Sequence, residues 1–185
     1  MINDILEDAK SRMNGAIESV RKEYGSIRTG RANISIFDDI MVDYCGSELP
    51  INQVASLSAP EARMLVIQPW DKGAIEPIEK AITSSGLGLN PQNDGAIIRI
   101  PIPVLTEERR LELVKHAKKK AEEGKISVRN VRRDAKDMIG ALEKESEISK
   151  DDSKRGQDEL QGITDSFVKK IDEMTANKET EIMEI

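Results

Sequence analysis

Lysine and arginine are concentrated in one segment of the chain, and their spacing points more clearly to a chemical role than that of any other residues. Between Arg109 and Lys136 there are eleven Lys or Arg residues and only four Asp or Glu. The rest of the chain is acidic, because the net charge of the whole is -6. A basic segment in an acidic chain predicts a local surface for a polyanion rather than a uniform attraction to nucleic acid.

On a helical wheel at about 100° per residue, the basic side chains gather on one edge, beside the apolar seam. The acidic residues of the same segment point in other directions, so we expect a nearly acid-free line of positive charge. Arginine is suited to such a line, because its planar guanidinium binds phosphate through two hydrogen bonds. The members of the line are Arg110, Lys118, Lys125, Arg129, Arg132 and Lys136.

RNA is the partner that this line favours. No aromatic residue lies between its members, so recognition of structured RNA through backbone and shape is expected rather than base stacking. Two alternatives remain open. The charged face could simply be solvated, or the chain could be a helical adaptor that binds only protein, which predicts weak dependence on salt and no protection of RNA.

Residues for catalysis or metal binding are scarce. His116 is the only histidine and Cys45 the only cysteine, which is too few for a His/Cys metal site. No EF-hand spacing occurs, and the Gly86–Gly88 stretch lacks the lysine of a phosphate-binding loop. We therefore predict no enzyme, no metal and no cofactor, with His116 on a helix surface and Cys45 buried or half-buried in a strand.

The expected location is the cytoplasm. No apolar run approaches the roughly 18 residues of a membrane span, and no secretory signal is visible at the N-terminus. A single cysteine cannot form an internal disulfide, which fits a reducing compartment.

All seven prolines lie between positions 50 and 103. Because proline disrupts helix interiors, the flanks can form long helices and the middle largely cannot. Apolar residues at helical spacing predict helices over about 2–28 and 106–146, and a third from about residue 149, with Thr106 and Ser149 as N-caps. In the second helix the predicted seam includes Met138 and Leu142. We expect an antiparallel three-helix bundle.

The middle of the chain predicts a small α/β domain inserted into this bundle. Alternating apolar residues indicate strands near 40–44, 55–58, 64–68 and 96–100, with a helix over about 73–85. The predicted class is thus α+β, with a bundle of residues 1–29 and 106–185 and an inserted domain of residues 30–105. The two chain connections should form a hinge at Gly30, Pro103, Val104 and Leu105.

Four stretches of this sequence resemble the bacterial ribosome recycling factor family. They are Arg28-Thr29-Gly30-Arg31-Ala32, Leu89-Asn90-Pro91, Leu105-Thr106-Glu107-Glu108-Arg109-Arg110, and Val128-Arg129-Asn130-Val131-Arg132-Arg133-Asp134-Ala135. Length, element order and the Ile148–Asp152 turn also agree. One departure is Val104, where family members often carry a second proline, which bears on the stiffness of the hinge.

The resemblance implies a β/α/β domain inserted after the first helix of a three-helix bundle, in an L-shape. It implies a monomeric factor that binds the large subunit of post-termination ribosomes. With elongation factor G and GTP, the factor splits the subunits so that mRNA and tRNA leave, and it performs no covalent chemistry itself.

Carried over by motif, the residues expected to contact ribosomal RNA are Arg28, Arg31, Arg110, Arg129 and above all Arg132. Lys118 and Lys125 complete the predicted site, either as contacts or as sources of positive potential. Arg109 and Arg133 rank lower because they point elsewhere on the wheel.

Overall fold

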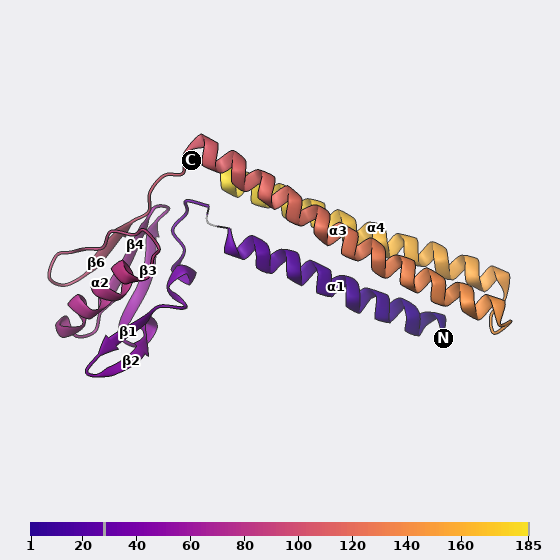
Figure 1. Cartoon of the computed structure of the whole chain (residues 1–185), viewed down its shortest axis with the longest axis horizontal. Coiled ribbons are helices and arrows are strands. Elements are labelled where there is room, and N and C mark those ends of the chain that lie inside the picture. The colour runs from indigo at the N-terminus through magenta and orange to yellow at the C-terminus, as the bar shows by residue number, and fades with distance from the viewer. Residues whose placement is uncertain (28, 185) are drawn as a thin grey trace. The chain divides into compact units, whose positions relative to one another are not determined.

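The computed structural model describes residues 1–27 and 29–184, which form two compact units (Figure 1). One unit comprises Met1–Thr29 with Thr106–Ile185, and the other Gly30–Leu105. The first is made of long helices and the second contains the strands, so the predicted α+β class is confirmed. Arg28 lies outside the described residues.

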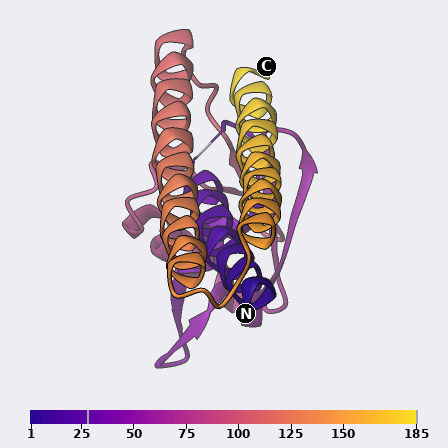
Figure 2. The same ribbon diagram turned by 90° about the vertical axis from the view of Figure 1, so that its right-hand side faces the viewer.

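Three helices make up the first unit: α1 (Ile2–Ser26), α3 (Glu107–Lys144) and α4 (Lys150–Met183). Each packs against the other two, and α3 runs antiparallel to both neighbours (Figures 1 and 2). The helices lie together because each buries an apolar seam. The residues at the centre of this core are Leu6, Met13, Ile17, Val128, Ile139, Leu160 and Ile171.

The helix starts are set by local side-chain chemistry. Thr106 Oγ1 accepts a hydrogen bond from the Arg109 backbone N at 3.2 Å, and Ser149 Oγ accepts one from the Asp152 backbone N at 3.0 Å. The Ser149 hydroxyl in turn donates to the Asp152 carboxylate, which with nearby Arg155 holds the pKa of Asp152 below its ordinary value. Both N-caps are the predicted residues, because a cap depends only on a few neighbouring positions.

One part of the predicted α3 seam is wrong. Met138 is 47% exposed, whereas the next residue, Ile139, is fully buried, and Leu142 is only partly buried. The buried positions continue from Val131 through Ala135 to Ile139 in steps of four. Helix seams alternate irregularly between steps of three and four, and only the partner helices decide which step applies.

A buried polar cluster joins all three helices near one end of the bundle. The Tyr24 hydroxyl donates to the Ala117 carbonyl oxygen at 2.9 Å and lies 2.8 Å from Thr175 Oγ1. The Thr175 hydroxyl also donates a hydrogen bond to the Ile171 carbonyl oxygen at 2.7 Å. Burial raises the pKa of Tyr24 above its ordinary value. Directional bonds at one level of the bundle fix how the helices slide along one another.

Replacing Tyr24 with phenylalanine should therefore lower the free energy of unfolding of the bundle by about 1–2 kcal/mol, because the hydrogen bonds are lost and their partners stay buried. Urea denaturation followed by circular dichroism measures this. Tyr44→Phe is the matched control, since that hydroxyl bonds Asp71 at an exposed site of the other unit. Equal losses in both variants would show that the buried cluster adds nothing.

The second unit contains a β-hairpin, a four-stranded antiparallel sheet, one α-helix and three short 3-10 helices. The hairpin pairs β1 with β2, and the sheet has the order β3-β4-β6-β5. Helix α2 packs its apolar side, Ile75, Ile78 and Ile82, into the same core as the strands. The elements are β1 (Met41–Tyr44), β2 (Ser47–Pro50), β3 (Ala55–Glu61), β4 (Met64–Pro69), α2 (Ile75–Ser84), β5 (Gln92–Asn93) and β6 (Ile98–Pro101).

Backbone geometry explains the positions of two residues in this unit. Cys45 is exposed and has φ +53° in the two-residue turn between β1 and β2, followed by Gly46 at φ +79°. Positive φ at both positions is typical of the tight hairpin turn whose twist matches its strands. The expectation of a buried or half-buried strand cysteine is therefore wrong. Pro77 falls in the first turn of α2, where no backbone N–H is needed.

Candidate nucleic-acid interface

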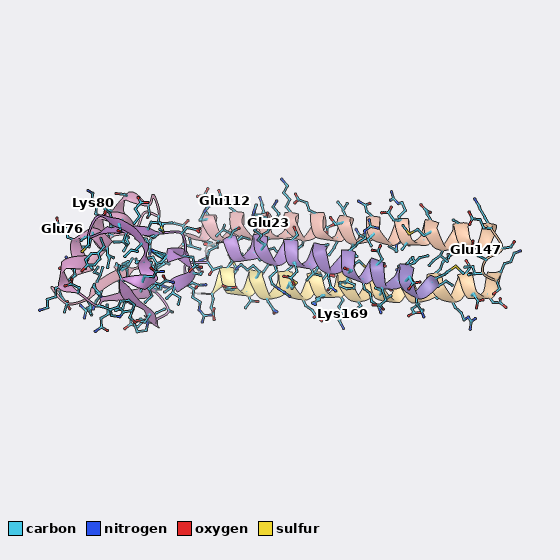
Figure 3. The ribbon with its side chains drawn as sticks, turned by 90° about the horizontal axis from the view of Figure 1, so that it is seen from below. Glu23, Glu76, Lys80, Glu112, Glu147 and Lys169 are labelled. Atoms are coloured by element: carbon cyan, nitrogen blue, oxygen red, sulfur yellow. The ribbon has the colours of Figure 1, made fainter. Side chains whose placement is uncertain are left out.

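The candidate interface lies on α3, whose packing determines which of its side chains face solvent. The helix buries a continuous seam against α1 and α4, including Ala117, Gly124, Val128 and Ala135. Charged side chains point outward from the helices of the bundle; Glu112 of α3 and Lys169 of α4 are labelled examples (Figure 3). His116 is exposed on the same helix, as expected.

Two of the predicted cations are paired with acids of the neighbouring helix. Lys118 Nζ lies 3.8 Å from Glu179 Oε1. Lys125 pairs with Asp172 and lies 3.6 Å from Glu122 Oε1. The hydrogen bond to Asp172 is the main reason that the pKa of Lys125 lies above its ordinary value.

The expectation of an acid-free edge is therefore wrong at Lys118 and Lys125. The helical wheel counted only the acids of the same segment, whereas Asp172 and Glu179 come from α4. Glu122 lies one turn before Lys125 on α3 itself. Lys125 is also mostly covered, with a side chain only 15% exposed, so its charge is partly compensated and its ammonium is held against the protein.

Beyond Lys125, the cations of α3 have no such acid partners among the residues that the structure describes. Arg129, Arg133 and Lys136 are exposed and Arg132 is half-buried. Within the described part of the chain none of the four makes an ion pair, since the nearby Asp134 turns toward Arg12 of α1 at 2.7 Å. We call these four residues the basic patch. They span about two helical turns and fall within about 100° of the helix surface.

The helical wheel ranks Arg133 low, because it points away from Arg132 there. Its exposure and lack of an ion pair among the described residues place it in the patch beside Arg129. A search for cations without an acid three or four residues away on either side would not have found it, because Asp137 follows at i+4. The helices packed around α3 decide which charges remain available.

The other predicted residues are distributed differently. Arg110 is half-buried in the first turn of α3, and its Nε is buried without a hydrogen-bond partner among the residues described. Arg31 is exposed and belongs to the second unit. The expected hinge residue Gly30 has φ +67°, and a Cβ built there would lie 3.3 Å from Leu105 Cγ, which is a tight contact. Pro103 and Val104 are exposed.

The described residues provide neither a metal-ligand cluster nor a membrane-spanning helix. They contain no group of three or more His, Cys, Asp or Glu side chains that could hold a metal ion. No helix among them has the length and apolar character needed to cross a membrane.

Comparison with known proteins identifies the family. The family model described as "Ribosome recycling factor" matches residues 20–183. The chain belongs to the ribosome recycling factor family. Among curated family members, the ribosome-recycling factor of Carboxydothermus hydrogenoformans is 55% identical over 185 residues, covering 100% of both chains. That of Clostridioides difficile is 51% identical over 182 residues, covering 98% of both.

Solved structures of the family agree with the fold. A solution structure of the ribosome recycling factor is 43% identical and matches with a TM-score of 0.74, covering 100% of this chain and 98% of that one. A second match, at 43% identity and a TM-score of 0.64 with 99% of each chain covered, is the T. thermophilus ribosome recycling factor. It is described together with E. coli elongation factor G, bound to the E. coli post-termination complex.

Proposed function

We propose that this protein binds the large subunit of post-termination ribosomes in the cytoplasm. Acting as a monomer with elongation factor G and GTP, it splits the subunits and so releases mRNA and tRNA. The observation that carries the proposal is the basic patch: four cations on one exposed stretch of α3, without ion pairs among the described residues, in an acidic chain. The T. thermophilus relative, described with elongation factor G on a post-termination complex, supports the choice of partners.

The bundle is the RNA-binding part in this proposal. Arg129 and Arg132 bind phosphates of ribosomal RNA through their guanidinium groups, and Arg133 and Lys136 add contacts beside them. Arg28, Arg31 and Arg110 contribute further contacts, and Lys118 and Lys125 contribute mainly positive potential. The protein needs no covalent chemistry of its own, because GTP hydrolysis by elongation factor G supplies the free energy for splitting.

The inserted domain, residues 30–105, has the second role. It swings about the hinge of Gly30, Pro103, Val104 and Leu105 and meets elongation factor G. Movement of elongation factor G thereby moves the bundle, which is bound to RNA, and the subunits separate.

A protein-only adaptor is less well supported by the surface of α3. Its exposed large apolar residues are Leu111, Ile126 and Met138. Successive members lie about 22 Å and about 18 Å apart along the axis, at about 1.5 Å per residue. Scattered single apolar residues are normal on a protein surface and do not form a docking face. An adaptor that binds only protein would also not account for the four cations of the basic patch, which have no ion pairs among the described residues.

Subunit splitting tests the proposal directly. Post-termination ribosomes are mixed with this protein, elongation factor G and GTP, and light scattering is followed over time. We expect the scattering to fall only when all three are present. Binding to the large subunit without splitting would limit the function to RNA binding, and no binding at all would favour the protein-only adaptor.

A further inference from the structure

The edge where α3 meets α4 carries a regular series of facing charged residues. On α3, Lys118, Lys125 and Arg132 follow one another at intervals of seven. On the antiparallel α4, acids at the same interval face them: Glu179 opposite Lys118 and Asp172 opposite Lys125. Continuing the series places Asp165 opposite Arg132.

The third pair differs from the first two. Arg132 makes no ion pair with Asp165; instead its Nη1 donates to the side-chain Oε1 of Gln161 at 3.3 Å. The Gln161 Nε2 donates to Asp165 Oδ1 at 2.8 Å. Gln161 thus stands between the cation and the acid that would otherwise neutralise it.

The chemistry of the two neighbours fixes the orientation of this amide. A guanidinium can only donate hydrogen bonds, and an ionised carboxylate can only accept them. The amide satisfies both only with its oxygen toward Arg132 and its nitrogen toward Asp165. Asp165 therefore holds the Gln161 oxygen in place for Arg132.

We propose that Gln161, oriented by Asp165, is a positioning residue that holds the Arg132 guanidinium ready for RNA without neutralising its charge. The inference rests on the proposed function, in which Arg132 contacts ribosomal RNA. One N–H of the guanidinium is used by Gln161, and its remaining donors stay available for phosphate. Holding a long side chain before binding reduces the entropy lost on binding. Lys125 shows the alternative, a cation that is held by a carboxylate and compensated by it.

The first test needs no ribosome. The motion of each arginine Nε–Hε group is measured by ¹⁵N relaxation in the free protein, for the wild type and for Gln161→Met. We expect Arg132 to be more restricted than Arg129 in the wild type and as mobile as Arg129 in the variant. Gln157→Met is the matched control, because Gln157 lies one turn earlier on α4 and bonds only Ser153 among the described residues. Equal mobility of Arg132 in all three proteins would overturn the proposal.

The second test asks whether the positioning matters for binding. Affinity for the isolated large subunit is measured over a range of salt concentrations, for Gln161→Met alone and combined with Arg132→Ala. Immobilising one long side chain contributes about 0.5–1.5 kcal/mol, so Gln161→Met should weaken binding about 2–12-fold, with an unchanged salt slope because the phosphate contact still forms. In the Arg132→Ala background the same change should have no effect.

The outcomes separate the two proposals. An equal loss of affinity in both backgrounds would show that Gln161 does not act through Arg132, and would overturn the inference. A wild-type protein that does not bind the large subunit would instead refute the proposed function. In that case the relaxation measurements still decide whether Gln161 restrains Arg132. Gln161→Glu adds a further check, because a carboxylate next to Arg132 should weaken binding more than methionine does.

Discussion

Replacing both Arg129 and Arg132 with alanine is expected to weaken binding to the large ribosomal subunit by at least about 150-fold, since hydrogen bonds to charged groups contribute about 1.5–3 kcal/mol each. Both residues belong to the basic patch, and neither has an ion pair within the described ranges. Their removal should leave the fold intact, because neither side chain is part of the apolar core.

A salt titration distinguishes loss of phosphate contacts from other causes. The slope of log affinity against log salt concentration should fall by about 1.4–1.8 when two phosphate contacts are removed. Thermal unfolding, followed by circular dichroism, should be unchanged. A loss of affinity at an unchanged slope would mean that the two arginines do not neutralise phosphates.

Lys118→Gln with Lys125→Gln is the matched control, because it also removes two positive charges from α3. These lysines pair with Glu179 and Asp172, so they are less available to RNA. Lys125 lies about 10 Å from Arg132 along the helix axis, which is longer than the screening distance at physiological salt. We therefore expect this double variant to weaken binding to the large subunit only about threefold. Equal losses in the two double variants would show that only total charge matters.

Gly124→Ala should destabilise the bundle, although alanine is the better helix former. Gly124 is buried where α3 meets both α1 and α4. A Cβ at this position would lie 2.5 Å from Val20 Cγ2 and 3.5 Å from Ile171 Cδ1. Val20 is β-branched and 3% exposed, so it has little room to turn away. Overpacking of this kind lowers the free energy of unfolding by about 1–3 kcal/mol.

Gly140→Ala is the control within the same helix, because a Cβ at Gly140 would meet nothing within 4 Å. There the gain in helix propensity should raise the free energy of unfolding by about 0.5–1 kcal/mol. Urea denaturation gives both values. Val20→Ala should cancel the penalty of Gly124→Ala, since it removes the clashing methyl group. Stabilisation by Gly124→Ala alone would show that α1 and α3 do not approach closely at this level.

Much of the fold was predictable because it depends on local chemistry. The absence of proline outside positions 50–103 allowed long helices in both flanks, and capping by Thr106 and Ser149 requires only residues three positions away. The alternation of apolar residues does not predict the two short strands β2 and β5. The choice between Met138 and Ile139 for the core depends on where α1 and α4 pack, which lies outside the reach of a local pattern.

The sequence by itself determined that α3 carries a basic face, because helical periodicity places residues three, four and seven apart on one side. Only the tertiary structure decided which of those charges remain available. Lys125 meets Asp172 and Arg132 meets Gln161, partners that lie 47 and 29 residues away in the chain. Electrostatic compensation depends on distance in space rather than in sequence, so the packing of α4 against α3 separates the compensated lysines from the basic patch.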